Sequence, residues 1–149
     1  MSHHYGKILL SMLFTVLMMA NVTIAQAADK SLADTKVVLQ ISDNDPSKQT
    51  LVLNVANNLI KHYGPESVDV EIVAFGPGLR LLFADNANSK RIAGLVSNNV
   101  KFSACGNTHK KMTQLLGKPP VLNSNATMVN AGVVRIIDLE NQGYKLIKP

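Results

Sequence analysis

Short runs of apolar, β-branched residues alternate along this chain with segments of helical periodicity, and this alternation restricts the fold more than any other feature of the sequence. Five such runs predict strands, at 36–42, 68–75, 100–104, 127–130 and 144–147. The segments between them predict helices at 51–60, 89–98, 106–116 and 131–142, with a short helical turn at 79–83. Strands separated by helices form βαβ units, which build a parallel sheet covered on both faces. We therefore expect an α/β three-layer sandwich of the flavodoxin-like type, with about five mostly parallel strands.

Local signals also predict how two of the helices begin, end and pack. Asp45 or Ser47 is expected to cap the first helix, and Gly64 is suited to end it. The last helix, 131–142, is amphipathic, and its apolar residues are expected to be buried. These residues are Val133, Val134, Ile136, Ile137 and Leu139.

The N-terminus has the pattern of an export signal. Lys7 is the only charged residue among the first 28, an apolar segment follows at 8–20, and the small residues Ala25 and Ala27 flank Gln26. A basic start, a short apolar core and a small-x-small site predict a cleavable signal peptide at 1–27. We therefore expect a periplasmic protein with a single domain at 28–149, without a membrane anchor after cleavage.

The charge of the chain is only mildly basic. The formal net charge of +5 falls to +4 when the leader, with Lys7, is removed. Basic residues are scattered, with adjacent pairs only at 90–91 and 110–111, and no aromatic stripe lies between them. This pattern is typical of a solvated surface and gives no indication of nucleic-acid binding.

The chain has a single cysteine, Cys105, so an internal disulfide is excluded. Cys105 follows a predicted strand and precedes a predicted helix, where the helix dipole lowers the pKa of a thiol. His109, Lys110 and Lys111 add positive potential, and Gly106 allows close approach to the sulfur. The alternative is a buried, inert cysteine, which is common for this residue type.

Sites in open α/β sheets form at the carboxyl ends of the strands, which here are followed by the loops 43–47, 76–79 and 105–108. A phosphorylated receiver domain would need an aspartate where this chain has Cys105. The first loop contains Asp43 and Asp45, which would repel the phosphate of a flavin. No metal-ligand spacing, P-loop or dinucleotide fingerprint is present, so we expect no metal and no cofactor.

Four segments of the chain resemble the DsrE/DsrF-like family, also called YchN-like. They are VVLQISDNDPSK at 37–48, VDVEIVAFGPGLRLL at 68–82, VKFSACGNT at 100–108 and AGVVRIIDLENQGYKLIKP at 131–149. Their order and spacing extend the resemblance over nearly all of the predicted domain. The resemblance implies the fold expected above, and a homo-oligomer, commonly a trimer or hexamer.

In better-studied members of that family a cysteine carries sulfur as a persulfide between partner proteins. Cys105 matches that cysteine, and the resemblance therefore implies a catalytic role for it in sulfur transfer. The neighbouring positions that the resemblance and the loop chemistry mark as binding residues are Gly106, Asn107, Thr108, Phe75, Gly76 and Gly78. The implied partners are sulfur donor and acceptor proteins.

Two functions thus remain open from the sequence. The first is a periplasmic sulfur carrier that acts through the thiolate of Cys105. The second is a non-enzymatic, oligomeric protein that binds a small ligand or a partner and in which Cys105 is structural.

Overall fold

A computed structural model describes residues 33–149, which fall in one compact unit. The predicted signal peptide at 1–27 and its cleavage site lie outside the described residues, so the leader stays a prediction. Within the described part, no helix is long and apolar enough to cross a membrane.

The centre of the fold is a five-stranded sheet in which every pair of neighbouring strands is parallel. The strands are β1 (Thr35–Ile41), β2 (Val68–Ala74), β3 (Lys101–Cys105), β4 (Ala126–Val129) and β5 (Lys145–Ile147). Their order across the sheet is β4-β3-β2-β1-β5. The five parallel strands predicted from the apolar runs are confirmed, each within two residues of its expected bounds.

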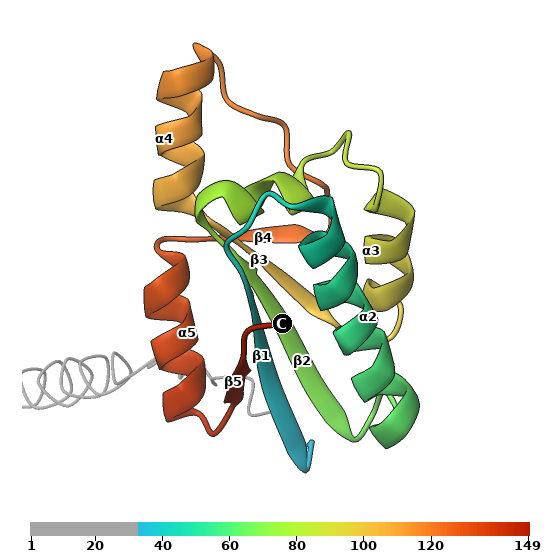
Figure 1. Cartoon of the computed structure of the whole chain (residues 1–149). Helices are drawn as coiled ribbons and strands as arrows, with labels where there is room; N and C mark the ends of the chain where they lie inside the picture. Colours follow the sequence, from blue (N-terminus) through green and yellow to red (C-terminus); the bar gives the residue numbers. More distant parts are fainter. Residues whose placement is uncertain (1–32) are drawn as a thin grey trace, which may run out of the picture. The chain divides into compact units, whose positions relative to one another are not determined.

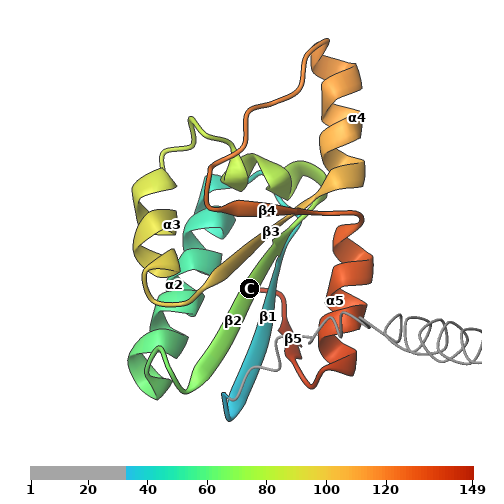
Figure 2. The same ribbon diagram turned by 180° about the vertical axis from the view of Figure 1, so that it is seen from behind.

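Helices cover both faces of this sheet, as Figures 1 and 2 show. The helices are α2 (Pro46–Tyr63), η2 (Gly76–Leu82), α3 (Ser89–Val96), α4 (Gly106–Leu116) and α5 (Gly132–Asn141). From β1 to β4, each strand lies beside the previous one on the same side, so the chain crosses the sheet in one direction. Right-handed crossovers therefore place α2 and α3 on the same face. It then returns to the far side of β1, which places α5 on the opposite face. The result is the expected flavodoxin-like three-layer arrangement.

The ends of α2 follow from its sequence. The Asp45 carboxylate accepts a hydrogen bond from the Ser47 N–H at 2.7 Å, so Asp45 is the cap. Pro46 occupies the first turn, where its missing N–H costs nothing. At the other end Gly64 adopts a φ of 86° and donates its N–H to the Ile60 carbonyl at 2.9 Å. Helix α2 therefore begins and ends where its capping residues require.

The two faces of the sheet differ in chemistry. The buried part of the face under α2 and α3 is apolar, and alternate residues of β1, β2 and β3 supply it. These are Val37, Leu39, Ile41, Val70, Ile72, Ala74, Phe102 and Ala104. The face under α5 combines a small apolar cluster with buried polar residues, among them Asp69, Glu71 and Ser103. Successive residues of a strand point to opposite faces of a sheet. Phe102 and Ala104 point to the face under α2 and α3, so Cys105 lies on the α5 face.

The expectation that the apolar residues of α5 are buried is only partly correct. Ile136 and Leu139 pack on the sheet, but Val133, Val134 and Ile137 are exposed at 53%, 54% and 50%. A helix on a sheet buries one stripe, and the apolar arc of α5 is wider than that stripe. An apolar surface therefore remains on the outer side of α5.

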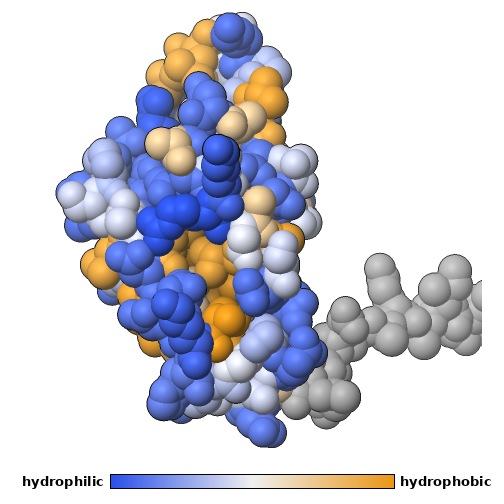
Figure 3. All heavy atoms as spheres, turned by 90° about the vertical axis from the view of Figure 1, so that its right-hand side faces the viewer, coloured by the Kyte–Doolittle hydropathy of each residue, from blue (hydrophilic) through white to orange (hydrophobic). Residues whose placement is uncertain are grey.

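Helix α4 rises from the carboxyl edge of the sheet and contacts β3 and η2 (Figure 1). None of its residues is buried, and Leu115 and Leu116 in its last turn are exposed at 71% and 50%. The His109 ring forms a hydrogen bond with the Pro120 carbonyl at 2.9 Å, which ties the connection after α4 back to the helix. Figure 3 shows hydrophobic atoms at the top of the molecule, where α4 projects.

Candidate functional site

The three loops expected to meet at the carboxyl edge of the sheet do so. Asn44 follows β1, Gly76 and Pro77 follow β2, and Asn107 and Thr108 follow β3. All five residues line one groove between α4 and η2. Parallel strands bring their carboxyl ends to one edge, and this is how residues distant in the sequence come together.

Cys105 ends β3 and occupies the residue before the first turn of α4. It pairs with Val129 of the edge strand β4. Only 5% of the residue is exposed, so the thiol is nearly covered by the protein. Burial alone would make such a cysteine inert. Its reactivity therefore depends on the groups that surround the sulfur.

Four hydrogen-bond donors surround the sulfur of Cys105. Burial raises the pKa of the thiol, but the Thr108 hydroxyl and the backbone N–H groups of Gly132, Thr108 and Asn107 lower it. The hydrogen bonds prevail, and the pKa of Cys105 lies below the ordinary value of a cysteine. The donors therefore stabilise the thiolate of Cys105, which is the nucleophilic form.

The Thr108 hydroxyl is oriented by the loop after β2. Its oxygen accepts a hydrogen bond from the Gly76 N–H at 2.9 Å, which leaves its own hydrogen for the sulfur of Cys105. Gly76 has a φ of 52°, in the left-handed region that glycine adopts without strain. Gly76 thus orients the Thr108 hydroxyl.

Gly132 was not among the binding residues expected from the sequence, yet its N–H also donates a hydrogen bond to the sulfur. Gly132 opens α5, so two helix N-termini converge on Cys105. A Cβ at Gly132 would lie 3.0 Å from the Phe75 Cβ and 3.3 Å from the Cys105 Cβ. The close approach of α5 therefore favours glycine, because a larger residue would push α5 away from Phe75 and Cys105. One sequence pattern could have identified Gly132. It lies near a second junction of strand and helix, between the predicted strand at 127–130 and the predicted helix at 131–142.

The other expected binding residues have mainly packing contacts. A Cβ at Gly106 would lie 3.0 Å from the Val129 carbonyl oxygen, so the chain itself approaches closely here. A Cβ at Gly78 would lie 2.4 Å from the Ile41 carbonyl oxygen, and Gly78 therefore packs η2 on the end of β1. Phe75 covers Gly132 and joins the small apolar cluster under α5. These residues therefore determine the shape of the site through their packing.

A buried ion pair holds α5 on the sheet. The Arg135 guanidinium donates to both Glu71 carboxylate oxygens, at 2.7 and 2.6 Å, and the Ser103 hydroxyl donates to the same carboxylate at 2.6 Å. Hydrogen bonding to Glu71 raises the pKa of the Arg135 guanidinium. Arg135 lies one turn after Gly132, so this pair fixes the turn of α5 that faces the sulfur.

A second polar cluster lies further along the same face. The Tyr144 hydroxyl donates to the Asp69 carboxylate at 2.5 Å, and the Lys101 ammonium lies 3.3 Å from the same oxygen. Burial, followed by the hydrogen bond to Asp69, raises the pKa of the Tyr144 hydroxyl. This cluster joins the loop after α5 to β2 and β3. Across residues 33–149, no group of three His, Cys, Asp or Glu side chains is placed to hold a metal ion.

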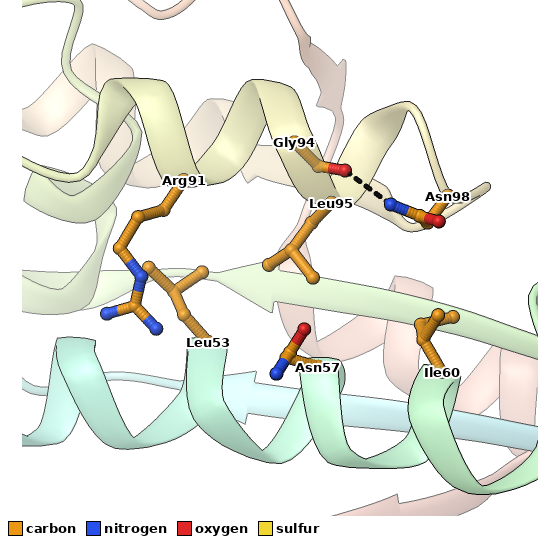
Figure 4. Close-up of a pocket in the computed structure, with 7 residues that line it drawn as sticks. All are labelled: Leu53, Asn57, Ile60, Arg91, Gly94, Leu95 and Asn98. Carbon is orange, nitrogen blue, oxygen red and sulfur yellow. Dashed lines mark hydrogen bonds between the residues drawn. The ribbon is translucent and has the colours of Figure 1, made fainter.

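A smaller groove of about 340 Å³ lies between α2 and α3, on the opposite face of the sheet from α5. Figure 4 shows Leu53 and Ile60 from α2 and Leu95 from α3 lining the space between the two helices. Asn98 donates to the Gly94 carbonyl at 2.8 Å and Arg91 donates to Asn54 at 2.6 Å, so the polar groups at its rim are engaged. This groove has no contact with the cysteine site.

No family model matches the sequence, and no curated protein matches it. Among solved structures, the chain is similar to the "protein of unknown function MTH1491" from Methanobacterium thermoautotrophicum. The two share 30% sequence identity and superpose with a TM-score of 0.70, over 78% of this chain and 100% of the other. The likeness covers the whole of that protein.

Proposed function

The chain belongs to the same family as MTH1491, a protein of unknown function, and we propose that it is a sulfur carrier that acts through Cys105. The observation that supports this proposal is the environment of the sulfur. Four hydrogen-bond donors from two helix N-termini lower the pKa of Cys105, although burial alone would raise it. A structural cysteine needs no such donors, because the neutral thiol packs as a small hydrophobe.

The chemistry needs no cofactor. The Cys105 thiolate attacks the outer sulfur of a persulfide, R–S–SH. A bond forms between Cys105 Sγ and that sulfur, the S–S bond of the donor breaks, and R–S⁻ leaves with the electron pair. The proton stays on the transferred sulfur, so no oxidant or reductant is consumed. Attack by an acceptor thiolate on the persulfide of Cys105 then releases the sulfur by the same exchange.

Location and assembly complete the proposal. The leader predicted at 1–27 supports a periplasmic location for the carrier, and the resemblance to the DsrE/DsrF-like family supports a homo-oligomer with sulfur donor and acceptor proteins as partners. The exposed apolar residues of α5, Val133, Val134 and Ile137, offer a surface for such an assembly.

Mass spectrometry tests the proposal directly. The protein is exposed to polysulfide or to an organic persulfide and then analysed without reductant. We expect an added mass of one sulfur atom, about 32 Da, on the peptide that contains Cys105 and none in Cys105→Ser. A thiol that accepts no sulfur from any donor and resists alkylating agents would contradict the proposal.

The burial of Cys105 favours a second candidate, an oligomeric binding protein in which the cysteine is structural. Only 5% of Cys105 is exposed, and a groove with an apolar lining lies beside it. Alkylation kinetics separate the two functions. A sulfur carrier reacts with iodoacetamide faster than a free cysteine at neutral pH, whereas a structural cysteine reacts only when the protein unfolds.

A further inference from the structure

A groove of about 720 Å³ lies between α4 and η2, beside the cysteine site. Its inner end is formed by Gly76, Asn107 and Thr108, and the side of α4 that carries Met112 and Leu115 forms a wall. Its volume lies within the range of roughly 300 to 1,000 Å³ that is usual for small-molecule sites. The groove is therefore large enough for a ligand well beyond a single sulfur atom.

The walls of the groove are mainly apolar. Leu115 and Leu116 line it although they are 71% and 50% exposed, and no residue of α4 is buried. Leu115 and Leu116 thus border a hollow and contribute little to the core, whereas Met112 also packs against the core. Contact with the hydrocarbon part of a ligand would remove the side chains of Leu115 and Leu116 from water, which favours binding.

The charged residues of the groove are all cations. Arg80 and Lys111 line it, no carboxylate does, and neither cation belongs to an ion pair among residues 33–149. The nearby Asp43 carboxylate is engaged with Lys48 at 3.1 Å, and Asp45 caps α2. The groove therefore complements a ligand with an apolar body and an anionic end.

The groove is connected to the sulfur through two residues. Asn107 and Thr108 line its inner end, and the same two residues donate hydrogen bonds to the Cys105 sulfur. A ligand that fills the groove consequently has one end against the residues that hold the thiolate.

We propose that this groove binds the organic part of the sulfur donor, and that the donor is a small persulfide with a hydrocarbon chain and a carboxylate. The inference rests on the proposed function, because Cys105 takes the outer sulfur of this donor by the exchange written above. Met112, Leu115 and Leu116 cover the chain, and Arg80 and Lys111 bind the carboxylate.

Three synthetic donors test the two parts of the groove separately. They are the persulfides of mercaptohexanoate, mercaptohexanol and mercaptoethanol, and the measured quantity is the rate of sulfur addition to Cys105 by mass spectrometry. Lys111→Glu is expected to slow transfer from the hexanoate donor about tenfold more than transfer from either alcohol, which corresponds to the loss of about 1.4 kcal/mol of binding to the carboxylate. Leu115→Ser is expected to slow both six-carbon donors and to leave the two-carbon donor unchanged.

Matched controls are available in the same region. Lys118→Glu makes the same charge change at an exposed residue just after α4 and outside the groove, and Val121→Ser removes an apolar side chain that is 74% exposed. Both controls should transfer sulfur at the wild-type rate from all three donors. Equal rates for Lys111→Glu, Leu115→Ser and the controls would overturn the groove assignment.

An unreactive analogue separates failure of the groove from failure of the carrier. Methylthiohexanoate has the same chain and carboxylate but no transferable sulfur, and calorimetry measures its binding to the wild type and to Cys105→Ser. Binding that Lys111→Glu weakens supports the groove even if Cys105 accepts no sulfur, in which case the carrier function is wrong. Sulfur transfer without any binding of the analogue leaves the carrier function and refutes the groove.

Discussion

The ion pair between Glu71 and Arg135 should be one of the largest single contributions to the docking of α5. The Glu71 side chain is 1% exposed and accepts two hydrogen bonds from Arg135, at 2.7 and 2.6 Å. Replacing Arg135 with methionine keeps the length of the side chain and removes the charge. The buried carboxylate then retains only the Ser103 hydroxyl, at 2.6 Å.

The expected cost follows from this loss of partners. Removing one member of a buried ion pair costs about 3–5 kcal/mol, because a buried charge is left without compensation. Arg135 is 33% exposed and Ser103 remains, so water and one hydrogen bond reduce the penalty. We expect Arg135→Met to lower the free energy of unfolding by about 3 kcal/mol, which lowers the melting temperature by about 10 °C.

Urea denaturation of three variants measures this effect. They are Arg135→Met, Glu71→Gln, and the double variant, in which the neutral amide still accepts from Ser103. The double variant should be more stable than Arg135→Met alone, because no charge stays buried without a partner. A cost for Arg135→Met below about 1 kcal/mol, or strictly additive effects in the double variant, would refute this reasoning.

Three further predictions concern glycines and the thiol. Gly78→Ala should destabilise the protein by about 3 kcal/mol in urea, because its Cβ would lie 2.4 Å from the Ile41 carbonyl oxygen, whereas Gly94→Ala, with nothing within 4 Å, should not destabilise it. Gly132→Ala should displace the N–H of α5 and raise the pKa of Cys105, seen as a shift of the alkylation profile to higher pH; an unchanged profile would exclude this role for Gly132. Because folding lowers the pKa of Cys105, thiolate formation stabilises the fold above the unfolded pKa of about 8.5, and this stabilisation is lost as the pH falls through the folded value. The stability of the wild type relative to Cys105→Ser should therefore increase as the pH rises toward the unfolded pKa, and a constant difference would contradict the lowered pKa of Cys105.

The fold could be predicted from the sequence because the patterns that specify its strands and helices are local. Strands of β-branched residues, the cap at Asp45 and the stop at Gly64 each act within a few residues, and the structure has them where the pattern predicts. The order of the strands is not a local property, and the apolar runs alone did not specify that β5 returns beside β1. The same limit explains the error for Val133, since helical periodicity defines an apolar face but not how much of it the sheet covers.

Only the part of the site that lies in one segment of the chain could be predicted from the sequence. The position of Cys105 before a helix was evident, and so was its neighbour Thr108. Gly132 lies 27 positions after Cys105, and Glu71 and Arg135 are separated by 64 positions, so their contacts depend on the folded sheet. Burial of the sulfur likewise arises from the packing of α5, which no local pattern indicates.

Helix α5 connects the proposed chemistry to the proposed assembly. Its first residue, Gly132, donates to the Cys105 sulfur, while Val133, Val134 and Ile137 on its outer side are exposed. Its inner side is fixed by the Glu71–Arg135 pair. A second subunit that covers the exposed side would hold the same turn that lowers the pKa of Cys105. Association and thiol reactivity should therefore change together, and an α5 surface variant such as Ile137→Ser that abolishes assembly but leaves the alkylation rate unchanged would show that the two are independent.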